Sequence, residues 1–329
     1  MKVLVVGGAG YIGSHAVMEL IKTGHDVVIY DNLSTGYEML IHPEAQFYLG
    51  DILDSKQLDR VIEHEQAKAH IDVVINFAAK LIVPESLEMP LEYFHNNTEG
   101  VRTLLAAMVK HDIKYIVFSS TAAVYGQPEG GICKEDMPLD PINPYGASKR
   151  ACEDIIKWVC KRYDMSYCIF RYFNVAGADE SLKIGLYHDQ ITHLIPVIMQ
   201  AALGIRDKFY VFGTDYNTPD GTCIRDYVHV SDLARAHVMG AEYLYENNSS
   251  LLANLGSGSG YSVKEVLDTA QKISEVPFEY GQRRPGDPDM LIADAQRAKE
   301  VLGWKPKLGM DKMLTSDLAF RKRLLQADK

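Results

Sequence analysis

The sequence predicts an α/β fold in which helices cover both faces of a parallel sheet. Three observations support this prediction. Apolar segments of strand length alternate with amphipathic segments of helical length through the first half of the chain. The first apolar segment, KVLVV at 2–6, is continuously apolar after its lysine, as expected for a strand buried on both faces. A glycine-rich turn then leads directly into the first helical segment, a connection typical of parallel sheets.

The elements of the first half follow one another in a regular order. Strands are expected at 2–6, 26–30, 46–50, 72–77, 115–120 and 167–173. Helices are expected between them, notably at 11–23, 55–65, 91–111 and 144–163. Because strands and helices alternate, we expect parallel strands joined by right-handed crossovers.

The pattern becomes less regular after residue 176. The expected elements are a helix at 189–204, a short strand at 209–213, a turn-rich loop at 215–222, a strand and helix at 225–244, and a helix that opens with the capping box Ser262–Glu265. We therefore expect a first domain over 1–176 and a smaller C-terminal α/β substrate domain over 177–329. The segment 225–246 could pack back on the first domain.

Composition narrows the classes of function. The chain has 329 residues, enough for one large or two medium domains, and 47% of them are hydrophobic. Its net charge of −10 argues against binding to nucleic acid or to a membrane surface. The five cysteines show no zinc-binding spacing, and no segment has the pattern of a signal peptide or a membrane span. We therefore expect no metal site, reduced thiols and a cytoplasmic location.

A glycine motif stands where the first strand meets the first helix. Gly7, Gly10 and Gly13 form a GxxGxxG pattern, in which glycine permits a tight turn and the close approach of a pyrophosphate to the backbone. The second strand ends at Asp31, 18 residues after Gly13, where a carboxylate can bind both hydroxyls of an adenosine ribose and repel a 2′-phosphate. No Lys or Arg occurs from Asp31 to Leu40, so the motif favours NAD over NADP in a Rossmann-type, doubly wound sheet. The alternative is a structural turn followed by a helix-capping aspartate.

Two further strand ends fit a cofactor site. Asp51 and Ile52 follow the third strand, where an acid could bind the adenine amino group. Phe77, Ala78 and Ala79 follow the fourth strand, where small residues would let the backbone lie close to a cofactor. Either could also be an ordinary strand terminus.

A tyrosine and a lysine lie four residues apart in the segment NPYGASK at 143–149. On a helix, Tyr145 and Lys149 would share a face. A phenol has a pKa of about 10. We expect the lysine ammonium and a positive nicotinamide ring to lower it, so that Tyr145 can take a proton from an alcohol. A tyrosine and a lysine at this spacing would by themselves be a coincidence in most proteins. Here the end of the fifth strand adds the hydroxyls of Ser119 and Thr121.

These residues together resemble the extended short-chain dehydrogenase/reductase family, and most closely its UDP-hexose 4-epimerases. The similarity runs nearly the whole length of the chain. The segments NVAGA at 174–178 and DGTCIRDYVHV at 220–230 are the most specific, because they lie outside the shared cofactor motifs. The resemblance implies an NAD-dependent interconversion of UDP-glucose and UDP-galactose through a 4-keto intermediate. It also implies a homodimer that pairs helices from 91–111 and 144–163.

The resemblance assigns roles to individual residues. Tyr145 would be the catalytic acid and base, Lys149 would hold the nicotinamide ribose and tune the phenol, and Thr121 would hydrogen-bond the sugar hydroxyl. The expected cofactor-binding residues are Gly7, Gly10, Tyr11, Ile12, Gly13, Asp31, Asn32, Asp51, Ile52, Phe77, Ala78, Ala79, Asn96, Ser119, Tyr145, Lys149 and Tyr172. The expected substrate-binding residues are Thr121, Asn174, His193, Leu194, Tyr210, Phe212, Arg225, Arg284, Asp287 and Leu291.

The expected substrate-binding residues would contact different parts of the UDP group. Asn174 would contact the diphosphate or the uridine, and 210–213 would bind the uracil. Arg225, Arg284 and Asp287 would hold the diphosphate and its ribose, because planar guanidinium groups suit phosphate oxygens. The alternative for Arg225 is an ordinary surface salt bridge.

Three positions depart from one bacterial form of the family. That form has FAGLKAV after the fourth strand, whereas this chain has FAAKLIV, so the lysine moves to Lys80 and its contact with substrate is in doubt. His193 replaces an asparagine, and a lone histidine on an amphipathic helix is more often structural. Leu291 replaces a bulky tyrosine, which leaves room for an N-acetyl group. UDP-N-acetylglucosamine and UDP-N-acetylgalactosamine are therefore a second candidate substrate pair.

Other functions are compatible with the same fold. A nucleotide-sugar 4,6-dehydratase would carry Asp-Glu directly after the threonine of the fifth strand, whereas Ala122 and Ala123 follow Thr121 here. A reductase of the same family is a weaker alternative. A dinucleotide-sensing regulatory protein would share the fold but could dispense with the Tyr–Lys pair.

Overall fold

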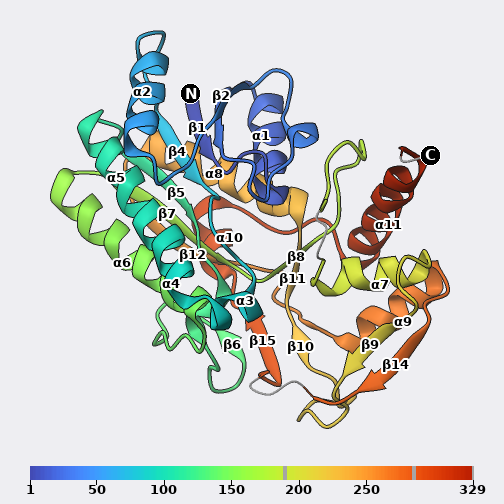
Figure 1. Ribbon diagram of the computed structural model, residues 1–329. Helices are drawn as coiled ribbons and strands as arrows, with labels where there is room; N and C mark the ends of the chain where they lie inside the picture. The colour runs from blue at the N-terminus through green and yellow to red at the C-terminus, as the bar shows by residue number, and fades with distance from the viewer. Residues whose placement is uncertain (188–190, 284–286, 328–329) are drawn as a thin grey trace.

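The computed structural model describes residues 1–187, 191–283 and 287–327 (Figure 1). The central sheet within these residues is formed by β1 (Lys2–Val6), β2 (Asp26–Asp31), β3 (Gln46–Leu49), β4 (Val73–Asn76), β5 (Tyr115–Ser119), β7 (Ser166–Tyr172) and β12 (Leu251–Leu255). All neighbouring strands are parallel, in the order β12-β7-β5-β4-β1-β2-β3. The order reverses between β1 and β4, so the sheet is doubly wound and the predicted Rossmann-type fold class is confirmed.

The six strands expected in the first half of the chain are all present, within one residue of their predicted ends. The strand β12 was not predicted. Its segment, LLANL, is short and has no regular alternation, and its place in the sheet depends on pairing with β7, from Leu251 beside Cys168 to Leu255 beside Tyr172. Because β12 lies beyond residue 176, both parts of the chain contribute to one sheet, and the domain boundaries remain a prediction.

Helices cover both faces of this sheet (Figure 1). The helices α1 (Tyr11–Lys22) and α8 (Val230–Asn247) lie on one face, and α2 (Ser55–Gln66), α5 (Gly100–Lys110) and α6 (Pro144–Tyr163) lie on the other. Alternate residues of a strand serve the two faces. In β1, Val3 and Val5 pack with α1 and α8, whereas Leu4 and Val6 pack with α2 and α5.

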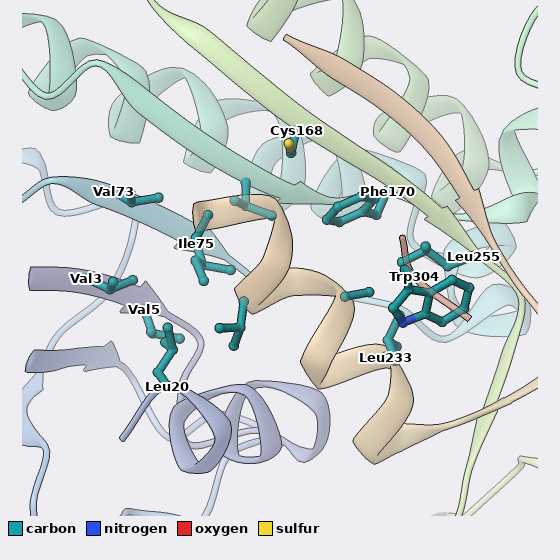
Figure 2. Packing of buried hydrophobic residues seen from close by; sticks show 14 of the residues in the cluster. Val3, Val5, Leu20, Val73, Ile75, Cys168, Phe170, Leu233, Leu255 and Trp304 are labelled. Carbon is teal, nitrogen blue, oxygen red and sulfur yellow. The ribbon is translucent and has the colours of Figure 1, made fainter. Parts of the chain in front are cut away.

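Figure 2 shows the core on the face of α1 and α8. Val5 of β1 lies near Leu20 of α1, and Leu233 of α8 lies farther along the same cluster, beside Trp304. Trp304, which follows α10 (Gln296–Leu302), lies beside Leu255 and belongs to the same cluster. Its indole Nε1 donates a hydrogen bond to the backbone oxygen of Asp232 at 2.9 Å. The start and the end of the chain therefore share one core.

Helix α6 begins at Pro144, as the sequence predicts. Oδ1 of Asn143 accepts a hydrogen bond from the backbone N–H of Gly146 at 2.8 Å and so caps the helix. Proline suits the first position because it has no N–H to leave unpaired. This start places Tyr145 in the first turn and Lys149 one turn later.

The helix expected at 91–111 is not one continuous α-helix. It consists of α4 (Pro90–Tyr93), a π-helical turn (Phe94–Glu99) and α5, and the helix α3 (Val83–Glu88) precedes it. Asn97 in the π-helical turn is buried, and its Nδ2 donates hydrogen bonds to the backbone oxygen of Lys80 and to Oγ of Ser148, both at 3.0 Å. Its Oδ1 accepts one from the backbone N–H of Lys80 at 2.8 Å. The turn therefore ties the loop after β4 to α6, as π-helical turns often do near functional sites.

The C-terminal part forms small sheets around a second core. The described strands of these small sheets are β6 (Ile132–Cys133), β8 (Asn174–Ala176), β9 (Phe209–Phe212), β10 (Ile224–Arg225), β11 (Tyr227–His229), β13 (Tyr261–Ser262), β14 (Phe278–Gly281) and β15 (Met290–Ala293). The helices are α7 (Leu194–Ala202), α9 (Val263–Ile273) and α11 (Met310–Ala327), and all three contribute to this core. The predicted capping box is present, since Oγ of Ser262 accepts from the N–H of Glu265 at 3.0 Å and Oε2 of Glu265 accepts from the N–H of Ser262 at 2.8 Å.

Helix α7 is shorter than the helix expected at 189–204. It begins at Leu194, because His193 has extended backbone angles and Pro196 fits only in the first turn of a helix. Residues 189 and 190 of the expected helix lie outside the described residues. Across the described ranges, no helix combines the length and the apolarity needed to cross a bilayer.

Candidate active site

The carboxyl ends of the central strands bring most of the predicted cofactor residues to one edge of the sheet. Gly7 follows β1, Asp31 ends β2, Asp51 comes shortly after β3, Phe77 follows β4 and Ser119 ends β5. Parallel strands end at the same edge, so residues distant in the sequence meet there. Because the strand order reverses between β1 and β4, Gly7 lies at the switch point where open α/β sheets bind ligands.

The glycine turn leaves no room for side chains. Gly7 has a φ angle of 82°, and a Cβ atom on it would lie 2.6 Å from the backbone nitrogen of Ala78. A Cβ atom on Gly13 would collide with the backbone oxygen of Gly7. No side chain caps the start of α1 at Gly10, and its first turn, which contains Tyr11, has no acidic residue. The bare backbone and the helix N-terminus, which no side chain caps, therefore fit a pyrophosphate.

Asp31 is held in place across this turn. Its Oδ2 accepts a hydrogen bond from the N–H of Ala9 at 2.9 Å, and its Oδ1 accepts one from the N–H of Leu33 at 2.8 Å. The side chain is buried, and burial raises the pKa of the carboxyl above its ordinary value, while the two backbone hydrogen bonds oppose that rise. Each carboxylate oxygen keeps further acceptor capacity for a ribose hydroxyl.

The predicted adenine-side residues lie together at the ends of β2 and β3. Nδ2 of Asn32 donates a hydrogen bond to the Asp51 carboxylate at 2.9 Å, and the N–H of Leu53 donates to its other oxygen at 2.8 Å. Ile52 packs under Gly100, where a Cβ atom would lie 2.9 Å from Cγ2 of Ile52. These residues are brought together, and their contact with a ligand remains a prediction.

Lys149 does not point at Tyr145. Its Nζ donates a hydrogen bond to the backbone oxygen of Ser119 at 2.8 Å and lies 4.8 Å from the centre of the Phe118 ring. Only 3% of the residue is exposed, and burial lowers the pKa of its ammonium from 10.5 to about 8. The helix spacing puts both residues on one face, but the ammonium is directed to the end of β5.

Without the nicotinamide ring that the expectation includes, the pKa of Tyr145 is not lowered. Burial raises the pKa of the phenol, and only its hydrogen bond with the Thr121 side chain acts in the other direction. The desolvation of the phenolate outweighs that one hydrogen bond. A phenolate at Tyr145 consequently needs a positive charge that the described residues do not place beside it.

Further residues lie near Tyr145 or its helix. The Tyr93 ring lies edge-on to the Tyr145 ring, with centroids 6.5 Å apart. Tyr172, the last residue of β7, interacts electrostatically with Tyr145 and lies close to the Ser119 side chain. Nδ2 of Asn96 donates to Oδ1 of its neighbour Asn97 at 3.0 Å. The predicted Asn96, Ser119 and Tyr172 thus lie around the catalytic helix, whereas Tyr93 and Asn97 were not predicted.

The predicted diphosphate residues meet in an ion pair. An Nη2 atom of Arg225 lies 2.6 Å from Oδ1 of Asp287, and the Tyr216 hydroxyl donates to Oδ2 of Asp287 at 3.3 Å. Leu291 is beside Arg225 in the parallel register of β10 and β15. Nδ2 of Asn174 donates to the backbone oxygen of Asp226 at 2.9 Å. Arg284 lies outside the described residues.

The remaining substrate residues belong to the C-terminal part. Tyr210 and Phe212 lie on β9 with 43% and 37% of their surfaces exposed, and their rings stack with centroids 6.2 Å apart. His193 and Leu194 stand at the start of α7. Exposed aromatic rings are suited to stacking on a base, and the contact with uracil remains a prediction. Among the described residues, no group of His, Cys, Asp and Glu could hold a metal ion.

A buried ion pair beneath the site was missed by the sequence analysis. The Arg171 guanidinium of β7 donates to both oxygens of Glu153 in α6, from Nε at 2.8 Å and from Nη2 at 2.6 Å. The Ser120 hydroxyl donates to the same carboxylate at 2.6 Å. Burial would raise the pKa of Glu153, but Arg171 and Ser120 outweigh it and hold that pKa below its ordinary value. The only sequence signal was the position of Glu153, one turn after Lys149 on the same helix.

The depressed pKa of Lys149 predicts a rise in stability at alkaline pH. Between about pH 8 and pH 10.5 the unfolded chain holds a proton on Lys149 that the folded chain has lost. The free energy of unfolding should therefore rise through this window by up to about 3 kcal/mol from this group. Urea unfolding of the ligand-free protein at several pH values should show this rise, and Lys149→Met should remove it.

Lys161→Met serves as the control, because Lys161 is an exposed lysine on the same helix. It should keep the wild-type dependence on pH. Equal pH dependence in wild type and Lys149→Met would show that the ammonium is not destabilised by burial.

Known proteins resemble this chain over almost its whole length. A family model described as GDP-mannose 4,6 dehydratase matches residues 4–316. The UDP-glucose 4-epimerase of Streptococcus mutans is 48% identical over 324 residues, which cover 97% of this chain and 96% of that protein. The dehydratase of the model's description would need carboxylates after Thr121, where this chain has Ala122 and Ala123.

Solved structures also match the fold over nearly the whole chain. The UDP-glucose 4-epimerase from Brucella ovis in complex with NAD is 42% identical, with a TM-score of 0.93 and 97% of both chains covered. The UDP-glucose 4-epimerase from Bifidobacterium longum in complex with NAD⁺ and UDP is 38% identical, with a TM-score of 0.89 and 98% of both chains covered. With the glycine turn, Asp31 and the Tyr145 helix in place at one sheet edge, the chain belongs to the UDP-glucose 4-epimerase family of extended short-chain dehydrogenases/reductases.

Proposed function

We propose that this protein interconverts UDP-glucose and UDP-galactose by inverting the hexose at C4, with NAD as a bound cofactor. The observation that carries the proposal is the meeting of the Tyr145 phenol and the Thr121 hydroxyl beside a strand-end cradle for a dinucleotide. Relatives named UDP-glucose 4-epimerase span nearly the whole chain and support the same conclusion. A reaction that restores its cofactor in each turnover needs no added oxidant.

The residues of the cradle fit NAD. The bare turn from Gly7 to Gly13 suits the pyrophosphate, and the buried Asp31 suits the adenosine ribose and disfavours a 2′-phosphate. Phe77 and Ala78 continue the same edge after β4. When bound, NAD supplies the acceptor and later the donor of the hydride that leaves and returns to C4 of the sugar.

Tyr145 would move the proton at the sugar O4 atom. Burial keeps its pKa high in the chain alone, so the phenolate becomes accessible when a positive nicotinamide ring faces it. Thr121 would orient the same hydroxyl, through the side chain that already hydrogen-bonds the phenol. Lys149, directed to Ser119 at the end of β5, would hold the nicotinamide ribose and add positive charge to the site.

Arg225 and Asp287 would hold the diphosphate and its ribose. Their ion pair orients the guanidinium, whose remaining N–H groups suit phosphate oxygens. The side chains of Tyr210 and Phe212 would stack against the uracil. Anchoring through the UDP group would leave the 4-keto sugar able to turn over and present its other face.

A second substrate pair is favoured by Leu291. This residue is partly buried and packs against the cluster that contains Ala122 and Val124, directly after Thr121. This packing supports a position for Leu291 near the sugar of the substrate, where a smaller side chain than tyrosine would leave space. We propose that UDP-N-acetylglucosamine and UDP-N-acetylgalactosamine are also interconverted.

We also propose that the protein is a homodimer that pairs α5 and α6 of two subunits. These helices are neighbours, and large apolar side chains are exposed beside and on them, with 82% of Leu91, 40% of Phe94 and 70% of Trp158 accessible. Large apolar side chains exposed on neighbouring elements support a surface that a partner covers. The cytoplasmic location of the protein stays a prediction.

Replacement of the proposed base should abolish most activity. Tyr145→Phe removes only the hydroxyl, so we expect a folded protein that retains NAD and loses roughly 100-fold or more in kcat, the usual contribution of a general acid–base. The assay is incubation with UDP-galactose and no added cofactor, with the product identified by NMR. Tyr163→Phe, an exposed tyrosine on the same helix, is the control; near-normal turnover in Tyr145→Phe would remove Tyr145 from the mechanism.

The acetylated substrates test the role of Leu291. Wild-type protein should act on both substrate pairs. In Leu291→Tyr, kcat/KM for the acetylated pair should fall by about tenfold or more relative to kcat/KM for the plain pair, because a larger side chain in a pocket typically changes discrimination by this factor. Measuring both pairs with the same preparation controls for folding. The second activity is refuted if wild type converts UDP-glucose but leaves the acetylated pair untouched.

A charge on the proposed interface should separate the subunits. Sedimentation velocity should show a dimer for wild type and a monomer for Trp158→Glu, since a buried unpaired carboxylate is costly. Tyr245→Glu places the same charge on an exposed tyrosine of α8 and should leave the dimer intact. A monomeric wild type at micromolar concentration would contradict the proposal.

A further inference from the structure

Ser119 connects three residues of the proposed active site. It is buried at the end of β5, and its backbone oxygen accepts the hydrogen bond from Nζ of Lys149 at 2.8 Å. Its hydroxyl also lies close enough to the Tyr172 phenol to influence its pKa, and Tyr172 in turn interacts electrostatically with Tyr145. The same hydroxyl lies 2.8 Å from Nε2 of His237. His237 is therefore one hydrogen bond removed from the site, although it has no place in the proposed reaction.

The His237 ring is fixed by aromatic neighbours. It lies in α8 with no exposed surface, and its centroid is 4.7 Å from that of Phe77, 5.2 Å from Phe170 and 6.1 Å from Tyr172. Two of these neighbours, Phe77 and Tyr172, are proposed cofactor contacts. The imidazole thus packs under the cofactor edge of the sheet and cannot turn without displacing them.

The hydrogen bonds of His237 decide where its proton lies. Its Nδ1 is 2.9 Å from the backbone oxygen of Leu233, which can only accept, so Nδ1 carries the hydrogen. Burial lowers the pKa of the imidazole from 6.5 to about 4, so the ring is neutral near pH 7 and Nε2 has only a lone pair. Ser119 must therefore donate its one hydroxyl proton to Nε2. The Ser119 oxygen then remains only an acceptor, so a hydrogen bond between it and the Tyr172 phenol can be donated only by Tyr172.

We propose that His237 is a positioning residue that aligns this chain of hydrogen bonds, so that Tyr172 donates to Ser119 and Ser119 donates to His237. The inference rests on the proposed epimerase function. With its proton directed to Ser119, Tyr172 presents only lone pairs to Tyr145 and to a bound cofactor. A Tyr172 proton aimed at Tyr145 would hydrogen-bond the phenolate and make it a weaker base toward the sugar hydroxyl. His237 prevents that alternative without touching the substrate.

Three substitutions separate this role from simple packing. His237→Phe keeps an aromatic ring but removes the acceptor, Ser119→Ala removes the donor, and His237→Gln can restore an acceptor near the position of Nε2. We expect kcat to fall about tenfold in the first two, the rate equivalent of one ordinary hydrogen bond, with KM for the UDP-sugar unchanged. His237→Gln should recover most of the loss. The double variant His237→Phe/Ser119→Ala should be no slower than either single variant, because both substitutions interrupt the same series of hydrogen bonds.

The imidazole can be observed directly by ¹⁵N NMR of the isolated protein. We expect a neutral ring with the proton on Nδ1, and a shift of the Nε2 resonance in Ser119→Ala. Ser316→Ala is the matched control, because Oγ of Ser316 lies 3.2 Å from Nε2 of a second buried histidine, His229, which ends β11 and caps the start of α8. It should leave both kcat and the His237 resonances unchanged.

Three results would overturn the proposal: a proton on Nε2 of His237, wild-type kcat in His237→Phe, or additive losses in the double variant. If His237→Phe does not fold, Ser119→Ala and the tautomer carry the test. The NMR result does not depend on turnover. A wild-type protein that fails to epimerise UDP-sugars would therefore refute the proposed function, while the hydrogen-bond assignment of His237 would still be decided.

Discussion

Glu153 of α6 and Arg171 of β7 form an ion pair at the centre of the molecule, with 0% and 2% of their side chains exposed. The guanidinium also donates to the Tyr125 hydroxyl at 3.1 Å, and Ser120 donates to the carboxylate. Two such charges are stable in the interior only when both are paired and hydrogen-bonded, as they are here. The pair fixes the helix that carries Tyr145 and Lys149 against the strand ends, and the geometry of the site depends on this connection.

The same burial sets the charges of the site. Desolvation raises the pKa of Tyr145 and lowers that of Lys149, so each group is moved away from its charged form in the chain alone. Their opposite charges do not offset this cost, because the ammonium is directed to the Ser119 oxygen. A cationic cofactor ring would change that balance for Tyr145. In the proposed reaction a bound dinucleotide would contribute to the basicity of Tyr145 as well as accept the hydride.

Much of the fold was predictable from the chain, because local patterns produced it. The predictions of β1–β5 and β7 were correct, since buried parallel strands are continuous apolar segments bounded by turn residues. Pro144 and Asn143 marked the start of the catalytic helix by standard capping chemistry. The π-helical turn at Phe94–Glu99 and the strand β12 were missed. The turn follows from the contacts of Asn97 with Lys80 and Ser148, and β12 from pairing with a strand some 80 residues earlier, so neither has a local signal.

The linear sequence was sufficient to propose the residue types of the site, because glycine at a tight turn, an acid at the next strand end and a tyrosine one turn before a lysine are local patterns. It could not show that Lys149 turns away from Tyr145, that Glu153 meets Arg171, or that His237 lies behind Ser119. Those facts depend on which side chains of distant segments share the same buried space. Hydrogen-bond direction and desolvation are properties of that space, and they appear only when the sheet has been assembled.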